Sequence, residues 1–121
     1  MSPFDTLQIA EVAHGANRAL RRALGEETKL GRGRAWALLD TAFKQRLADG
    51  VDQQRLEPVS PEVCHERWMA AMQNSGWVHG ETQDLIMMTH PNLLPWDELP
   101  EEQRAKDRLF IAIIAALSPQ P

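Results

Sequence analysis

The chain has 121 residues, 43% of them hydrophobic, and carries 13 Lys or Arg against 17 Asp or Glu, for a net charge of −4. This length fits one domain, residues 1–121, and the apolar content excludes a disordered tail. The acidic balance argues against nucleic-acid binding, while the single cysteine and the lack of a signal peptide or a membrane-length apolar run indicate a cytoplasmic protein.

Two helices are expected in the first half of the chain. Apolar residues recur at helical spacing over Pro3–Leu24, and a glycine follows as a stop signal. Thr28–Gly33 is rich in glycine and basic residues and is expected to be a loop. A second helix is predicted over Ala35–Ala48, ended by Gly50, with Val51–Val59 as a polar connector.

Two further helices are expected in the second half. Ser60 is a good N-cap residue and Pro61 suits the first helical position, so a third helix should start there and run to about Ser75. Pro100 opens the last helix, and two glutamates follow in its first turn, where the helix dipole favours them.

Between these helices lies the long segment Trp77–Glu98, which is too irregular for a long element. Short strands near Trp77–Val78 and Leu93–Leu94 would allow a small two-stranded hairpin. Because the segment is rich in tryptophan, leucine and methionine, we expect it to be ordered. The predicted fold is therefore mainly α, with about four helices and one long ordered loop between the third and last helices.

No catalytic or metal-binding pattern is complete. His65 and Glu66 begin the H-E-x-x-H pattern of zinc proteases, but Met69 stands where the second histidine should be. No base and nucleophile are spaced to act together. We therefore expect no catalytic residue, no metal and no cofactor.

One face of the first helix is polar and basic. His14, Asn17, Arg18 and Arg21 follow the spacing i, i+3, i+4 and i+7. This set is either a solvated basic face or an anion site. Asn17 also falls on the apolar stripe, where its amide needs hydrogen-bond partners that a polar ligand can supply.

Trp68 and Asp107 allow two interpretations each. Trp68 is either a core residue or a flat platform on which a nucleobase stacks. Asp107 precedes the apolar stripe of the last helix. It either forms an ion pair, for example with Arg104 or Arg108, or faces a pocket and accepts hydrogen bonds from a ribose or a base.

Several motifs resemble those of the ryanodine-receptor repeat (RyR) domain family. They are H-E-R-W at 65–68, G-W-V-H-G at 76–80, H-P-N-L-L-P-W at 90–96, D-E-L-P-E-E-Q-R-A-K-D at 97–107 and, near the N-terminus, I-A-E-V-A-H-G-A-N-R at 9–18. Together these segments cover both ends and the C-terminal half of the chain.

The resemblance implies an adenine-nucleotide site that, in the large calcium-release channels, lies between two repeats. The tryptophan of H-E-x-W stacks on the base there, a role that carries over to Trp68, and His65 of the same motif is a further candidate for ligand binding. Asp107 matches a polar residue that helps line the site. Gln83 stands where the family often has a basic residue for phosphate, so His14, Arg18 and Arg21 would supply the charge instead.

The expected function is non-catalytic binding of a nucleotide-derived small molecule, such as an adenine nucleotide, ADP-ribose or a cyclic nucleotide signal. The small stand-alone members that the chain resembles occur in bacteria and phages, where such a module would sense or sequester its ligand. Because channel repeats work in pairs, a homodimer is expected. The alternative is a protein-interaction module that uses the same aromatic surface.

Overall fold

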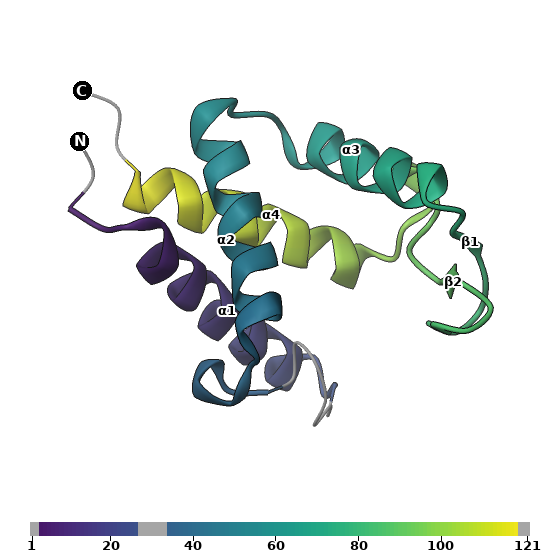
Figure 1. The fold of residues 1–121 in the computed structure, drawn as a ribbon, viewed down its shortest axis with the longest axis horizontal. Coiled ribbons are helices and arrows are strands. Elements are labelled where there is room, and N and C mark those ends of the chain that lie inside the picture. Colours follow the sequence, from purple (N-terminus) through teal and green to yellow (C-terminus); the bar gives the residue numbers. More distant parts are fainter. Residues whose placement is uncertain (1–2, 27–33, 119–121) are drawn as a thin grey trace. The chain divides into compact units, whose positions relative to one another are not determined.

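The structure, a computed structural model, describes residues 3–26 and 34–118 and is mainly helical, as predicted (Figure 1). The loop predicted over Thr28–Gly33 lies outside these residues. The elements in chain order are α1 (Thr6–Ala23), the 3-10 helix η2 (Trp36–Leu38), α2 (Thr41–Leu56), α3 (Pro61–Asn74), β1 (Val78–His79), β2 (Thr89–His90), the 3-10 helix η3 (Trp96–Glu98) and α4 (Glu101–Leu117).

The chain forms two compact units. Unit 1 comprises Met1–Pro58 and Ala105–Pro121, and unit 2 comprises Val59–Arg104. Unit 1 thus holds α1, α2 and most of α4, whereas unit 2 holds α3, both strands and η3. The organisation of residues 1–121 as a single domain stays a prediction.

The first helix of unit 1 begins later than its apolar pattern suggested. Asp5 is the N-cap: its carboxylate accepts from the Gln8 backbone N–H at 2.8 Å, and the Gln8 side chain accepts from the Asp5 N–H at 2.9 Å. This reciprocal capping box satisfies two N–H groups that the helix leaves unpaired, so the helix starts at Thr6 rather than at Pro3.

The second helix was predicted with the wrong bounds. Residues Trp36–Leu38 form a separate 3-10 turn. Helix α2 begins after Asp40, its N-cap residue, whose carboxylate accepts from the Phe43 N–H at 2.7 Å. The helix then runs through Gly50 to Leu56, so the predicted polar connector is helical in its first part. A glycine inside a helix costs about 1 kcal/mol. The next residue, Val51, is completely buried, and its burial offsets this cost.

The core of unit 1 is small and aliphatic. Its fully buried members are Ile9 and Ala10 of α1, Val51 of α2 and Ile114 of α4. Half-buried apolar side chains pack around them: Trp36, Leu47, Phe110 and Leu117. Burial of each large aliphatic side chain contributes roughly 1.5–3 kcal/mol, so the three helices of the unit are held together mainly by this cluster.

The main helix of unit 2 has the predicted bounds. The Ser60 hydroxyl accepts from the Val63 N–H at 3.2 Å, and Pro61 occupies the first turn. At the other end, Gly76 has φ +94°, a conformation that favours glycine, and it ends the helix where the sequence indicated.

The two short strands of unit 2 pair in parallel, with Val78 opposite Thr89 and His79 opposite His90, and so do not form the hairpin considered from sequence. The antiparallel turn lies elsewhere: Asp84 and Thr89 exchange backbone hydrogen bonds of 3.0 and 3.1 Å around residues 85–88. Leu93–Leu94, the second predicted strand, is instead irregular chain.

Candidate functional site

Trp68, the strongest candidate from sequence, lies half-buried on α3 and contacts two histidine rings. Its ring centroid is 5.5 Å from that of His65 and 5.0 Å from that of His90, the latter in an edge-to-face arrangement with an interplanar angle of 75°. His65 also contacts Trp96, at 6.1 Å between centroids. These four rings, from α3, β2 and η3, are called the aromatic cluster below.

His65 fixes the position of this cluster. The residue is buried, and its Nε2 lies 2.7 Å from the Leu94 carbonyl oxygen. A carbonyl only accepts, so Nε2 carries the proton and donates. The bond joins α3 to the chain before η3. Because positions i and i+3 share a helix face, a held His65 ring also restricts the ring of Trp68.

His90, the second neighbour of Trp68, is held by its own turn. The Asn92 backbone N–H donates to His90 Nδ1 at 3.0 Å, so this nitrogen is unprotonated and the neutral ring carries its proton on Nε2. Sequence analysis did not place His90 in the site. The only sequence signal for His90 was its position at the start of the H-P-N-L-L-P-W segment. That signal does not predict the contact with Trp68, which depends on the pairing of the two strands.

Gln83, the position of the expected departure from the family, is exposed on the loop after β1. The neighbouring Asp84 is used by the loop itself, since its carboxylate accepts from the backbone N–H groups of Ile86 and Met87 at 2.9 and 3.0 Å. The loop is further fixed by the Thr89 hydroxyl, which donates to the Thr82 carbonyl at 2.9 Å. Gln83 is therefore presented from an ordered loop.

The predicted polar face of α1 lies in unit 1, and part of it is buried. His14 is buried and donates from Nε2 to the Arg34 carbonyl, with its ring 6.1 Å from that of Trp36 and 6.4 Å from that of Phe43. Asn17, also buried, accepts from Arg21 Nε at 2.8 Å. The hydrogen-bond partner that this amide was expected to need is thus provided by the same helix.

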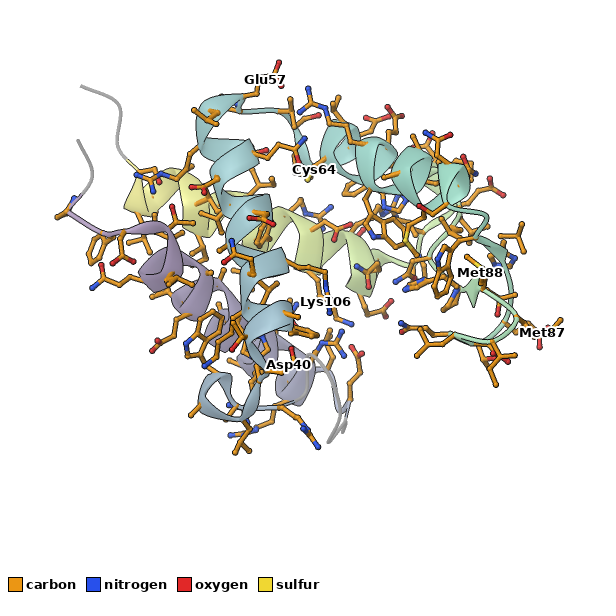
Figure 2. All side chains as sticks on the ribbon, viewed as in Figure 1. Asp40, Glu57, Cys64, Met87, Met88 and Lys106 are labelled. Atoms are coloured by element: carbon orange, nitrogen blue, oxygen red, sulfur yellow. The ribbon has the colours of Figure 1, made fainter. Side chains whose placement is uncertain are left out.

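The charge of Arg21 is balanced by a carboxylate that sequence analysis missed. Glu26 Oε1 lies 4.0 Å from the Arg21 guanidinium and 2.8 Å from Nζ of Lys106, which is buried and labelled in Figure 2. Lys106 precedes the half-buried Phe110 and the buried Ile114 at helical spacing, a signal that it lies on the inner face of α4. No local pattern indicates Glu26, which is 80 residues away in sequence.

The remaining candidates are half-buried: Arg18 lies on α1 and Asp107 on α4, both in unit 1. The sequence-predicted residues therefore divide between the units. The aromatic cluster and Gln83 belong to unit 2, whereas Asp107 and the polar face of α1 belong to unit 1.

The sequence model of the RyR domain matches residues 50–114, more than half of the chain. The chain therefore belongs to the RyR domain family. The match contains the aromatic cluster, Gln83 and Asp107, whereas residues 9–18, which also resemble the family, lie outside it. No curated protein matches the chain.

Two further findings concern residues 3–26 and 34–118. None of the helices there combines the length and the apolar character needed to cross a membrane. Over the same ranges, no three His, Cys, Asp or Glu side chains are grouped so as to hold a metal ion.

Proposed function

We propose that this RyR domain is a non-catalytic binding module for a nucleotide-derived small molecule, such as an adenine nucleotide, ADP-ribose or a cyclic nucleotide signal. The observation that carries the proposal is the half-buried indole of Trp68, which is held by contacts with the rings of His65 and His90. An aromatic ring held in place by packing loses little freedom when a base stacks on it, and such stacking is worth about 1–3 kcal/mol per base.

In this proposal, each of the candidate residues of unit 2 has a separate role. Trp68 is the stacking surface and His65 positions it through the bond to Leu94. Gln83 offers an uncharged amide to ribose or phosphate oxygens. Unit 2 is short of positive charge, because Arg67 and Arg104 are its only Lys or Arg residues in sequence. The site should therefore depend on the base more than on the phosphates. The ligand roles of Asp107 and of His14, Asn17, Arg18 and Arg21 stay predictions.

We also propose that the chain acts as a homodimer in a bacterial or phage setting, where it senses or sequesters the ligand. The support is the use of paired repeats in the channels that the family resemblance points to. Light scattering on the purified chain measures this directly: a mass of twice 13.7 kDa supports the dimer, and a mass of 13.7 kDa at all concentrations contradicts it.

A thermal-shift titration with ATP, ADP-ribose and cyclic adenine dinucleotides tests the binding function. A ligand at 100 times its Kd adds about 2.7 kcal/mol to the stability of the folded state and so raises Tm. Trp68→Leu should abolish the shift. The matched control is Trp36→Leu, which removes the half-buried tryptophan of unit 1 and should lower Tm while keeping the shift.

The outcomes distinguish the candidate functions. No shift with any of these nucleotides contradicts the binding function and favours the alternative, a protein-interaction module that uses the same aromatic surface. A shift followed by turnover of the bound nucleotide over hours would instead make the protein an enzyme.

A further inference from the structure

The loop that follows β1 exposes three consecutive large apolar side chains. Leu85, Ile86 and Met87 are 76%, 92% and 69% exposed. In Figure 2, Met87 lies at the outer edge of the loop. A single exposed leucine is ordinary in a folded protein, but three in succession on one turn form a continuous apolar tip.

Neither packing nor turn formation explains the three exposed residues Leu85, Ile86 and Met87. A tight turn favours Gly, Asn, Asp or Pro, whereas here the four residues between Asp84 and Thr89 are all large and apolar. The last of them, Met88, has φ +57°, a conformation that costs a long side chain energy and that Gly or Asn would adopt more readily. Residues that oppose the local preference and are not buried point to a use outside the fold.

The tip is held rigidly from inside the loop. Asp84 accepts from the backbone N–H groups of Ile86 and Met87, and its own backbone pairs on both sides with Thr89. Met88 is half-buried and its methyl group lies close to Gly76, so it anchors the base of the loop. Since the backbone is already ordered, little conformational entropy is lost when the tip binds.

The charges around the tip indicate the kind of partner. Two carboxylates, those of Glu81 and Asp84, belong to this loop, and the chain from residue 68 to residue 103 contains no Lys or Arg. Loops and helices that enter anionic membrane surfaces carry the opposite charge. An apolar tip on a loop that carries acidic residues and no Lys or Arg complements an apolar pocket that is bordered by basic residues.

The size of the tip argues against a dimer made by this contact alone. A stable interface buries about 800 Å² on each partner, from some 20–30 residues. Three side chains fit the other common arrangement, in which a few anchor residues fill a pocket and supply most of the binding energy.

We propose that residues 84–89 form a preorganised docking loop whose Leu85, Ile86 and Met87 side chains enter an apolar pocket, bordered by Lys or Arg, on a partner protein. This interaction is separate from nucleotide binding at Trp68.

Site-specific photo-crosslinking in the cells that make the chain locates the partner. A benzophenone amino acid replaces Met87 in one variant and Gln73, an exposed residue of α3, in the control. We expect one adduct of defined mass from position 87 that is missing from position 73. Equal labelling at both positions, no adduct at position 87, or an adduct only with a second copy of the chain would overturn the proposal.

The adduct partner, once purified, gives the quantitative test. Ile86→Asp should weaken its binding by about tenfold or more, because a charge is placed in an apolar pocket. Gln83→Ala should leave the affinity unchanged within about twofold, and high salt should weaken the wild-type complex. Unchanged affinity of Ile86→Asp contradicts the proposal. So does Ile86-dependent sedimentation with vesicles of phosphatidylcholine and phosphatidylserine.

Two controls separate this proposal from the others. Because Ile86 is almost fully exposed, Ile86→Asp should melt at the wild-type temperature. It should also keep the nucleotide-induced Tm shift. Loss of partner binding with that shift retained supports the docking loop whatever the outcome for Trp68.

Discussion

The two units contain the same local arrangement with different surroundings. In each, a buried histidine donates from Nε2 to a backbone carbonyl and packs against tryptophan: His14 with the Arg34 carbonyl and Trp36 in unit 1, and His65 with the Leu94 carbonyl and Trp68 in unit 2.

The difference lies in the polar groups nearby. In unit 1 they contact one another: Arg21 donates to Asn17, and Glu26 lies close to both Arg21 and Lys106. In unit 2 the polar partners of the cluster are backbone groups, the Leu94 carbonyl for His65 and the Asn92 N–H for His90. A buried histidine is thus a structural device in both units, and its presence alone does not identify a ligand site.

The largest expected effect is the loss of either buried histidine. His14→Ala and His65→Ala each remove a buried ring and a hydrogen bond, so each should lower the free energy of unfolding by about 3 kcal/mol. His79→Ala, at an exposed position, should change it by less than about 0.5 kcal/mol. Chemical denaturation measures all three values. A change near zero for either buried histidine would contradict the equivalence of the two arrangements.

The next effect concerns glycines. A Cβ on Gly80 would lie 2.5 Å from the Thr89 Cβ, so Gly80→Ala must push apart the chain segments that carry β1 and β2 and should cost about 1–3 kcal/mol. A Cβ on Gly15, inside α1, meets nothing within 4 Å, so Gly15→Ala should stabilise by about 0.5–1 kcal/mol. Thermal melts compare the two variants. Equal effects would show that the close approach at Gly80 is absent in solution.

A smaller effect is expected at the ion pair of unit 1. Lys106→Met removes the charge but keeps most of the buried stem. Because the Glu26 carboxylate is 39% exposed, water compensates part of the lost interaction, and we expect a loss of about 1 kcal/mol. A double-mutant cycle with Glu26→Gln isolates the coupling between the two residues. A coupling energy of zero would mean that the contact between Lys106 and Glu26 does not stabilise the fold.

The smallest effect is expected at Gln83. An exposed Gln83→Arg substitution should leave stability within about 0.5 kcal/mol. It should strengthen binding of phosphate-bearing nucleotides by up to about fivefold, the size of one exposed ionic contact, without strengthening binding of the nucleoside. Calorimetric titration of both ligands checks this. Equal gains for nucleoside and nucleotide would show that Gln83 does not lie beside a phosphate.

Local signals explain which parts of the fold could be predicted. The start of α3 depends on Ser60 and Pro61 and its end on Gly76, all readable in the sequence, and its bounds were correct. The course of α2 through Gly50 depends on burial of Val51 in a core completed by Ile114, more than 60 residues away in sequence. No local pattern contains that information.

The candidate site divides in the same way. Trp68 and His65 were singled out from sequence through the motif H-E-R-W, and the structure places their ring centroids 5.5 Å apart. The Leu94 carbonyl and the His90 ring reach them only through tertiary structure. The exposure of Leu85, Ile86 and Met87 was not predicted from the sequence, because it depends on the hydrogen bonds that Asp84 makes within the loop.

The most direct measurement of the central claim uses the indole N–H signals of the 15N-labelled chain. The signal of Trp68 is assigned by its loss in Trp68→Phe, and that of Trp36 serves as the internal reference in unit 1. During titration with ATP, ADP-ribose and cyclic adenine dinucleotides, the Trp68 signal should shift with at least one ligand while the Trp36 signal stays in place. A Trp68 signal that no saturating ligand moves, or that moves no more than that of Trp36, would contradict base stacking on Trp68.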